Sequence, residues 1–538
     1  MHNLYYFHQD WVQPSQETLS ADLCVYGASA GGTIAAIKAA RLGLSVVLLQ
    51  PGKHIGGMTS GGLGWTDFGR KYVIGGMSRQ FYRDLGKNYG RDEEWQFEPH
   101  VAENQLAACL DATDVTVRFC SYLDEVFCDG ARIAAISLLG GLRVEAKMFI
   151  DASYEGDLMA GANVRYTVGR EGNDVYREKL NGIQVRDKHQ FSHPVDPYVV
   201  AGDPSSGLLP HVIGEDLSAS QGRGDNRVQA YNFRVCMTDD PELKIDWAKP
   251  DGFDPAEYVL ATRWFNSRKD AYNEHLHDGH LGKFDIFPNK TPGGYHKTDT
   301  NNQGPVSSDF IGANYAWPEA DYAAREKLFQ AHVTYQQGLY WHMANCPEIP
   351  SRYRQAYQQW GLARDEFTDT AHWPHQLYVR EARRLVGDYV ITEHDCTGAA
   401  VAPDSIGMGS YTMDSHNTAR FVKVENGQAR VLNEGDVQVP PTDPYPVSYR
   451  AILPPAGQVE NLLVPICFSA SHIAYGSARM EPVFMVLGES AATAVKIALD
   501  NGCGLHDVKY DELRPELLSA GQVLELPPAD QRTSSPIV

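Results

Sequence analysis

Six residues near the start of the chain combine the residue types and the spacing that bind a phosphate group. The run GASAGG occupies positions 27–32, directly after a short apolar stretch at 23–26 and directly before alanines and aliphatics with helical spacing at 33–42. Such a turn presents free N–H groups and the positive end of a helix dipole to an anion. The pattern predicts a site for the pyrophosphate of a dinucleotide cofactor, formed by Gly27, Ser29, Ala30, Gly31 and Gly32.

The chain departs from the usual dinucleotide pattern at two positions. The first glycine permits the tight turn, the third position lets the backbone approach the phosphates, and the sixth lets the helix pack on the sheet. The third position holds Ser29, and Gln50 stands where an acid normally binds the adenosine ribose. Gln50 can still accept a hydrogen bond from a ribose hydroxyl. The lost charge assistance costs about 1 kcal/mol, against roughly 12 kcal/mol for nanomolar binding, so the site remains the prediction.

A strand, a helix and a second strand are needed to hold this turn. The apolar runs at 23–26 and 45–49 indicate buried strands, and the helix over 33–42 ends at Gly43 in the C′ position. Strand, turn, helix and strand in close succession form a right-handed βαβ unit.

Residues 115–150 indicate a β-meander, because Asp129-Gly130 and Gly140-Gly141 separate runs of alternating apolar residues. The meander leads into MFIDASYEGD at 148–157, a buried strand that opens into a turn. Only one glycine-rich βαβ unit is visible, whereas a flavoprotein disulfide reductase that uses a pyridine nucleotide would show two. The glycine-rich turn alone leaves NAD and FAD open. The inserted meander is typical of FAD proteins, so FAD is the predicted cofactor.

The middle of the chain differs in character from the two ends. Eleven of the nineteen histidines lie between His189 and His375, and apolar periodicity there is weak. We expect an inserted α+β substrate or cap domain with long loops, carried by an α/β, Rossmann-like FAD-binding fold of the glutathione-reductase type. The expected divisions are 1–164 and 376–505 for the FAD-binding domain, 165–375 for the cap domain and 506–538 for a C-terminal tail.

Seven motifs carry a resemblance to a known family. They are GASAGG at 27–32, GGMTSGGLGWTD at 56–67, IDASYEGDLMAGA at 150–162, VQAYNFRVCMT at 228–238, KTDTNN at 297–302, YVREARRLVGDYVIT at 378–392 and SHIAYGSARMEPVFMVLGESAATAV at 471–495. Together they resemble the FAD-dependent oxidoreductases related to fumarate reductase and succinate dehydrogenase flavoproteins, some of which carry a "xanthan lyase" label. The resemblance covers most of residues 20–500 and is specific to the family rather than to a substrate.

The resemblance implies which residues contact the cofactor. A second glycine-rich segment would pass beneath the flavin, with Gly56, Gly57, Met58, Gly61 and Gly62. Asp151 and Asp157 match the turn near the pyrophosphate. Since an acid cannot face phosphate directly, Asp157 is expected to contact ribose or a backbone amide.

A helix that begins near Pro482 is implied to aim its N-terminus at the pyrimidine end of the flavin. Its positive end would assist hydride acceptance. The resemblance therefore adds four further candidates for cofactor binding, which are Arg380, Glu481, Pro482 and Met485.

A proton must also move at the reacting centre, and histidine titrates in the useful range. His472 is the candidate acid/base or substrate anchor, with a helix-capping or loop histidine as the alternative, and Tyr475 is a weaker candidate. Arg479 would bind a carboxylate or polarise an oxygen, unless it forms an ion pair with Glu481 or with another acid inside the fold. The arginines around Glu381 would clamp an anion or, as we favour, tie the cap to the FAD domain. Polar groups at 297–302 would bind a polyol or order a loop.

Composition excludes several classes of function. The net charge of −21 repels nucleic acid and anionic membrane surfaces, and no apolar run reaches about 20 residues. Neither a signal peptide nor a C-x-x-C pair is visible, so we expect a cytoplasmic protein with reduced thiols. His275, His277 and His280 have metal-like spacing but loop-like neighbours, and no metal is expected. His54 is considered as a site of covalent flavin attachment, since some relatives use a histidine in this neighbourhood. Its position in the sequence does not fit well, so covalent attachment is not expected.

The expected function is hydride transfer between flavin N5 and a small polar metabolite, either a sugar-like alcohol or a carboxylate. An NAD(P)H-dependent monooxygenase and a non-catalytic redox sensor are the alternatives. The substrate is a small molecule, the electron acceptor is unknown, and a homo-oligomer is compatible with the sequence.

Overall fold

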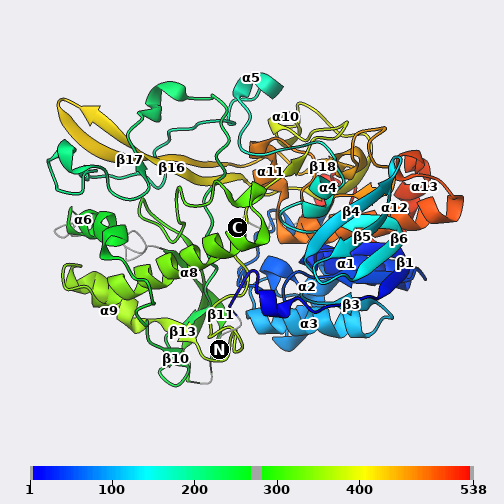
Figure 1. The fold of residues 1–538 in the computed structure, drawn as a ribbon, viewed down its shortest axis with the longest axis horizontal. Coiled ribbons are helices and arrows are strands. Elements are labelled where there is room, and N and C mark those ends of the chain that lie inside the picture. Colours follow the sequence, from blue (N-terminus) through cyan, green and yellow to red (C-terminus); the bar gives the residue numbers. More distant parts are fainter. Residues whose placement is uncertain (1–3, 268–281, 292, 533–538) are drawn as a thin grey trace.

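A computed structural model describes residues 4–267, 282–291 and 293–532. Its main sheet has the strand order β3-β2-β1-β6-β5-β4, and β19 also pairs with β6 (Figure 1). Strands β1, β2, β3, β6 and β19 pair in parallel, and β4, β5 and β6 pair antiparallel. The strands are β1 (Thr18–Tyr26), β2 (Val46–Leu49), β3 (Thr116–Arg118), β4 (Leu123–Asp129), β5 (Arg132–Leu138), β6 (Arg143–Asp151) and β19 (Leu462–Leu463).

The predicted βαβ unit is present as β1, α1 (Ala30–Arg41) and β2. The predicted meander is present as β4, β5 and β6, but β3 is not part of it. Instead β3 extends the parallel part of the sheet beside β2, with Val47 to Leu49 opposite Thr116 to Arg118. Strand β6 returns beside β1 for eight register positions, from Thr18 opposite Arg143 to Tyr26 opposite Asp151.

The long helix α12 (Glu481–Asn501) packs directly against α1. A Cβ on Gly31 would lie 2.7 Å from the Phe484 carbonyl oxygen, and a Cβ on Gly488 would lie 2.1 Å from the Gly31 oxygen. The two helices therefore cross where each has a glycine. Among the described residues, α12 is the one helix long and apolar enough to span a membrane, and 83% of its apolar window is buried inside the protein.

Pro482 lies in the first turn of α12, where the sequence predicts the helix start, and Gly502 ends the helix with φ +61°. A further hairpin turns at Asn426-Gly427, between β16 (Met413–Glu425) and β17 (Gln428–Val439). Asn426 and Gly427 both have positive φ, which the tight turn requires.

The cap region contains more regular structure than the weak periodicity indicates. Its sheet has the order β10-β13-β9-β12-β11, and the 24-residue helix α8 (Tyr322–Asn345) crosses the middle of the molecule (Figure 1). The helix shows no simple apolar stripe because Arg325, His332 and Gln336 are buried on it. The cap elements are β9 (Met237–Thr238), β10 (Lys244–Ile245), β11 (Gly282–Lys290), β12 (His296–Asn302), β13 (Gly361–Ala363), α6 (Val259–Ser267) and α9 (Ser351–Gln359).

Shorter elements complete the fold and connect its parts. The remaining strands are β7 (Tyr166–Thr167), β8 (Val212–Ile213), β14 (Arg384–Leu385), β15 (Ser405–Gly409) and β18 (Tyr445–Ser448). The remaining helices are α2 (Gly76–Asn88), α3 (Pro99–Asp111), α4 (Asp157–Gly161), α5 (Asn173–Tyr176), α10 (Glu393–Cys396), α11 (His472–Ala478) and α13 (Tyr510–Ser519). The expected domain boundaries stay a prediction.

Candidate active site

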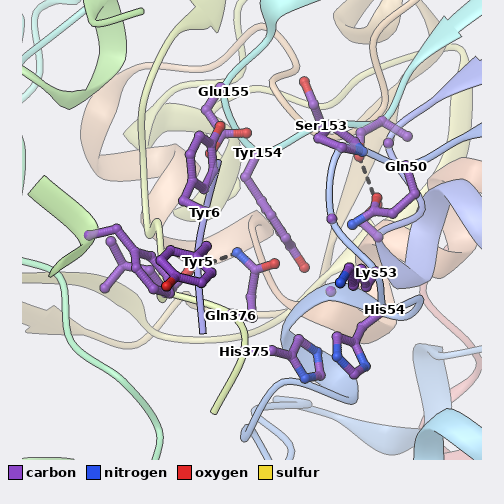
Figure 2. Close-up of a pocket in the computed structure, with 18 of the residues that line it drawn as sticks. Tyr5, Tyr6, Gln50, Lys53, His54, Ser153, Tyr154, Glu155, His375 and Gln376 are labelled. Carbon is purple, nitrogen blue, oxygen red and sulfur yellow. Dashed lines mark hydrogen bonds between the residues drawn. The ribbon is translucent and has the colours of Figure 1, made fainter. Parts of the chain in front are cut away.

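A cleft opens at the carboxyl ends of β1, β2 and β6, which is where parallel α/β sheets bind their ligands (Figure 2). One wall is the turn after β1 with the segment after β2. The turn after β6 forms a second wall, and residues 375–377 with the N-terminal segment close the opposite side. Its lining includes Tyr5, Tyr6, Trp11, Gly27, Ser29, Gln50, Gly57, Ser153, Tyr154, Glu155, His375 and Gln376.

Gly27 is pressed against the end of β6. Its φ is +98°, and a Cβ there would lie 2.5 Å from the Ser153 nitrogen and 2.6 Å from the Ala152 carbonyl carbon. Its N–H donates to the Leu49 oxygen at 2.8 Å, so the turn is also tied to β2. A Cβ on Gly32 would lie 2.0 Å from the Gly27 oxygen. Both positions therefore accept only glycine without movement of the backbone.

Ser29 stabilises the turn with its side chain. Its Oγ donates to the Ala152 oxygen at 2.8 Å and accepts from the Gly32 N–H at 3.2 Å, which caps α1. Ala30 and Gly31 follow as buried residues of the first helical turn. The serine at the third position thus anchors the helix start, and Gly27 and Ser29 both line the cleft.

Gln50 also lines the cleft, at the end of β2. Its Oε1 accepts from the Ala28 N–H at 2.8 Å. The sequence predicts that Gln50 accepts a hydrogen bond from a ribose hydroxyl. In the structure its Oε1 already accepts from the Ala28 N–H of the turn. The amide NH₂ group is therefore the part of Gln50 best placed for a ligand.

The second glycine segment is held close to other backbone. Gly56 and Gly57 have φ values of +92° and +54°, and a Cβ on Gly57 would lie 2.2 Å from the Tyr154 hydroxyl. Cβ atoms on Gly61 and Gly62 would meet Gln376 Cβ at 2.3 Å and the Arg234 oxygen at 2.0 Å. The segment is a fixed wall, and Gly57 reaches the cleft. Met58 is fully buried.

A buried carboxyl lies behind this wall. Glu481 Oε1 accepts from the Tyr154 hydroxyl at 2.7 Å, and Oε2 accepts from Thr59 Oγ1 at 2.9 Å. Within the described parts of the chain, the groups that act on Glu481 are these two hydroxyls, and no cation is among them. Burial raises the pKa of Glu481 to about 7. Tyr154 lines the cleft and also accepts from the Met58 N–H at 2.9 Å, so it connects Glu481 with the cleft.

Glu481 is expected from the sequence to contact the cofactor, but a role in proton transfer is not. The signal is its place one residue before Pro482, at the start of a long apolar helix. Pro482 itself accepts from Ser78 Oγ through its carbonyl oxygen, and Met485 is fully buried in the core. Neither lines the cleft, so their predicted cofactor contacts stay predictions.

Asp151 organises the turn after β6. Its Oδ1 accepts from Ser153 N–H and Oγ, and its Oδ2 accepts from the Met159 N–H at 2.8 Å. Burial raises the pKa of Asp151 to about 6. Both oxygens of Asp151 accept hydrogen bonds from its own turn, so Asp151 positions Ser153 at the cleft rather than contacting a ligand.

Asp157 links the turn to the cap. Its two oxygens accept from Arg325 on α8 at 2.6 and 2.9 Å and from Arg383 at 2.7 Å. Burial alone would raise the pKa of Asp157, but the two arginines hold this pKa below its ordinary value. The structure thus places an arginine pair where the sequence predicts ribose or a backbone amide.

Asp157→Asn should destabilise the protein, because it leaves two largely buried guanidinium groups without their shared charge. We expect a loss of about 3 kcal/mol in the free energy of unfolding, measured by urea denaturation. The control is Glu145→Gln, which removes the exposed partner of Arg143 and should cost less than about 1 kcal/mol. Equal effects of the two substitutions would contradict this assignment.

Three buried arginines surround the Tyr378 ring. Arg234, Arg380 and Arg479 lie 6.0, 4.7 and 5.6 Å from its centroid, and Arg479 donates to the Tyr378 hydroxyl at 2.9 Å. Tyr378 directly follows two cleft residues, Gln376 and Leu377. This arginine cluster is thus next to the cleft residues in sequence through Tyr378, and none of its arginines lines the cleft.

Each arginine of the cluster has an aspartate partner. Arg234 forms a bidentate ion pair with Asp299. Arg380 Nη2 lies 2.9 Å from Asp309 Oδ1, and Arg479 Nη2 lies 3.5 Å from Asp414 Oδ2. The predicted cofactor contact of Arg380 and the predicted carboxylate contact of Arg479 stay predictions. Sequence reasoning missed the cluster because its members come from distant segments.

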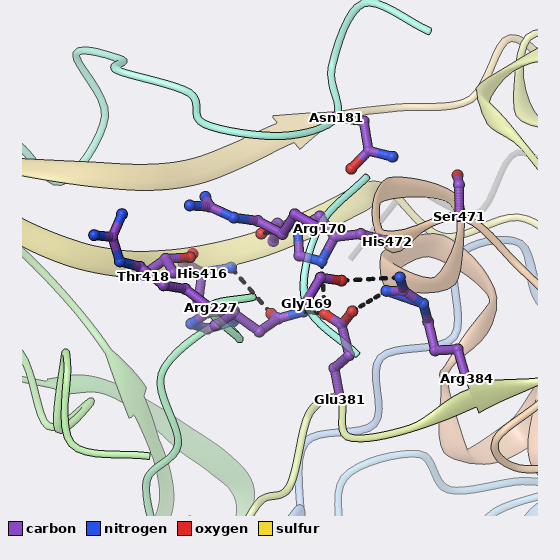
Figure 3. Close-up of polar contacts among 12 residues, drawn as sticks. Gly169, Arg170, Asn181, Arg227, Glu381, Arg384, His416, Thr418, Ser471 and His472 are labelled. Atoms are coloured by element: carbon purple, nitrogen blue, oxygen red, sulfur yellow. Dashed lines mark hydrogen bonds and ion pairs between the residues drawn. The ribbon is translucent and has the colours of Figure 1, made fainter. Parts of the chain in front are cut away.

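His472 lies in a buried polar network away from the cleft (Figure 3). Its Nδ1 is 2.6 Å from Glu381 Oε2, and its Nε2 is 2.9 Å from Ser415 Oγ. Arg384 also pairs with Glu381. Tyr475 is buried and donates to the Ile466 oxygen at 3.2 Å. The cap of α11 is Ser471, so the contacts of His472 favour a structural role within the buried network over a helix-capping role. The catalytic roles of both residues stay predictions.

A stacked histidine pair forms the floor of the cleft. The rings of His54 and His375 are parallel within 7°, with centroids 3.8 Å apart. Burial opposes charge on His54, but Asp369 and Glu103 raise its pKa to about 9. Burial and the charge on His54 lower the pKa of His375 well below its ordinary value.

A metal ion does not fit this pair as it stands, although His54, His375 and Glu103 are close enough together to be considered. Zinc needs nitrogen ligands that converge at about 2.0–2.1 Å. The lone pairs of stacked parallel rings lie in separate planes, so they do not converge. His275, His277 and His280 lie outside the described residues.

The polar residues of the cap motif at 297–302 mostly serve the fold. Lys297 lies 2.7 Å from Asp365 and 2.8 Å from Glu366. Asn301 Oδ1 accepts from Arg380 at 3.2 Å, and Asn302 lies 3.3 Å from His189 Nδ1. These residues lie in strand β12, so their contacts favour a role in the fold over a polyol site.

The cleft fits a dinucleotide cofactor. The Gly27 position is a cradle that a Cβ would fill, and the capped start of a 12-residue helix stands beside it. Gln50 lies at the position for a ribose, and the glycine wall ends at the buried start of α12. The residues that would hold the cofactor are Gly27, Ser29, Gln50, Gly57, Ser153 and Tyr154.

Comparison with known proteins shows the family to which the chain belongs. A family model described as FAD dependent oxidoreductase matches residues 22–517. No curated protein matches the sequence at a significant level. Kinship with fumarate reductase and succinate dehydrogenase flavoproteins stays a prediction.

Several solved structures are similar over part of the chain. A 3-ketosteroid-Δ4-(5α)-dehydrogenase from Rhodococcus jostii RHA1 is 14% identical over 28% of this chain and 51% of its own, with a TM-score of 0.20. NikD, an unusual amino acid oxidase, is 13% identical over 29% and 57%, with a TM-score of 0.23. The myxobacterial chondrochloren halogenase is 18% identical over 28% and 41%, with a TM-score of 0.23. The matched part spans about half the length of the first two chains.

Proposed function

Because this chain belongs to the FAD-dependent oxidoreductase family, we propose that it is a dehydrogenase or reductase of a small, neutral, polar metabolite such as a sugar-like alcohol. The observation that carries the proposal is the buried Tyr154–Glu481 pair at the cleft, next to the glycine wall. When bound, FAD supplies the redox chemistry by accepting or returning a hydride.

The chain itself has to bind, orient and exchange a proton. In oxidation of an alcohol, the hydroxyl proton needs an acceptor as the hydride leaves. Burial raises the pKa of the Glu481 carboxyl to about 7, so this group is ionised in about half of the molecules at neutral pH. Tyr154 donates to Glu481 and borders the cleft, so its hydroxyl can pass a proton from the cleft to the carboxylate.

The charge of the surroundings supports a neutral substrate over a carboxylate. The three arginines near the cleft are matched by Asp299, Asp309 and Asp414. A bound carboxylate would have to displace one of these aspartates or add a further negative charge beside them. Either change is costly where the effective dielectric constant is low.

The proposal is tested by anaerobic mixing of the purified flavoprotein with three kinds of reductant. We expect neutral polyols or sugars to bleach the visible flavin absorbance at least tenfold faster than mono- or dicarboxylates at equal concentration. NADPH should reduce the flavin slowly. Rapid reduction by NADPH alone would support a monooxygenase, and preferential reduction by carboxylates would contradict the charge argument.

A further inference from the structure

Residues 4–11, here called the N-terminal arm, form part of the cleft wall. Tyr5, Tyr6 and Trp11 line the cleft, and Tyr5 and Tyr6 lie across it from Gln50 (Figure 2). The arm also precedes residue 22, where the match to the family model begins. The match to the family model therefore says nothing about the arm.

A single carboxylate on the cap helix holds the arm. Glu326 Oε2 accepts from the Tyr6 N–H at 2.8 Å and from the Phe7 N–H at 2.9 Å. Gln330 on the same helix donates to the Leu4 oxygen at 2.8 Å. Bonds from backbone N–H groups to an ionised carboxylate are among the stronger hydrogen bonds. The arm is thus fastened to α8 along its backbone.

The other side of the arm contacts the FAD-binding half of the molecule. The Tyr122 hydroxyl donates to the Tyr6 oxygen at 3.1 Å, and the Phe7 and Tyr122 rings lie edge to face with centroids 4.9 Å apart. Lys53, a cleft residue, places its ammonium 4.0 Å from the centroid of the Trp11 ring. The arm therefore bridges α8, the start of β4 and the segment after β2.

We propose that the N-terminal arm is a cofactor-binding element that retains FAD in the cleft. The inference rests on the cofactor occupying this cleft, as the proposed function requires. An extended dinucleotide buried between the turn at Gly27 and the arm cannot leave until the arm separates from α8. The aromatic side chains of Tyr5, Tyr6 and Trp11 add apolar, ring-bearing surface of the kind that contacts a purine or flavin ring.

The test is the rate of FAD release from the loaded protein, followed by the return of flavin fluorescence after dilution. Two variants weaken the arm in different ways. Glu326→Leu removes the carboxylate that accepts hydrogen bonds from the Tyr6 and Phe7 N–H groups. The double variant Tyr5→Ala with Trp11→Ala keeps that carboxylate but removes two aromatic side chains from the cleft wall. The control is Tyr295→Ala, which removes a partly exposed ring on the turn between β11 and β12.

We expect each arm variant to release FAD at least tenfold faster than the Tyr295→Ala control, with circular dichroism unchanged. Release within threefold of the control by the double variant would overturn the proposal, even if Glu326→Leu failed to fold. Any larger acceleration supports it. If the unaltered protein bound no FAD at all, the cleft assignment itself would fail, which is a different outcome from an unchanged release rate.

Discussion

Gly27→Ala is expected to weaken FAD binding by at least a hundredfold, which corresponds to about 3 kcal/mol. The added Cβ would lie 2.5 Å from the Ser153 nitrogen and 2.6 Å from the Ala152 carbonyl carbon. These are backbone atoms at the end of β6, so they cannot rotate away. The turn would have to move, and with it the start of α1 and the wall of the cleft. Titration of the apoprotein with FAD, followed by flavin fluorescence, measures the effect.

Gly43→Ala separates the steric clash from the backbone conformation. Gly43 ends the same helix with φ +84°, but a Cβ there has no neighbour within 4 Å. This substitution should cost about 1 kcal/mol of stability and leave FAD affinity unchanged. Equal FAD affinity of the Gly27 and Gly43 variants would show that the turn at Gly27 does not approach the cofactor.

Glu481→Gln is expected to slow reduction of the flavin by substrate by about a hundredfold, the lower end of what a positioned acid or base contributes. The amide keeps the size of the side chain but cannot accept the substrate proton. Since burial raises the pKa of Glu481 to about 7, the ionised form accumulates as the pH rises through 7. Substrate oxidation should therefore speed up between about pH 6 and 8 in the unaltered protein. The rate in the variant should be flat over this range. Stopped-flow absorbance across pH values provides the measurement.

Glu489→Gln is the matched control on the same helix. Glu489 is buried like Glu481, but it lies 3.2 Å from Lys38 and accepts from the Met77 N–H, away from the cleft. We expect lower stability and an unchanged pH profile. Loss of the pH step in the Glu489 variant, or its persistence in Glu481→Gln, would remove Glu481 from the proton path.

The nucleotide half of the fold could be predicted because local sequence determines it. The turn at 27–32, the end of α1 at Gly43 and the start of α12 at Pro482 each depend on residues within one turn of the feature. The glycine motif also identifies the cleft, since strand, turn and helix must meet at a sheet edge.

The cap region and the surroundings of the site could not be predicted in the same way. Helix α8 buries Arg325 and His332, so its sequence lacks the apolar stripe that indicates a helix. The aspartate partners of the arginine cluster are 65 to 71 residues away from Arg234, Arg380 and Arg479, and only tertiary structure brings them together. The backbone bonds of the N-terminal arm to Glu326 span 320 residues.

His472 illustrates the limit of reasoning from residue type. A histidine before a motif near the cofactor is a natural proton donor, yet Glu381 and Ser415 occupy both of its ring nitrogens. Glu481 has the less suitable ordinary pKa, but burial without a cation raises that pKa into the useful range. Burial and partners, which the sequence does not display, decide between the two.

A crystal structure of the FAD complex tests the central claim most directly. We expect the pyrophosphate at the Gly27–Gly32 turn and the flavin ring at the Gly56–Gly62 wall, with Tyr154 between the ring and Glu481. A flavin ring bound away from this wall, or a pyrophosphate that does not touch the turn after β1, would contradict the account.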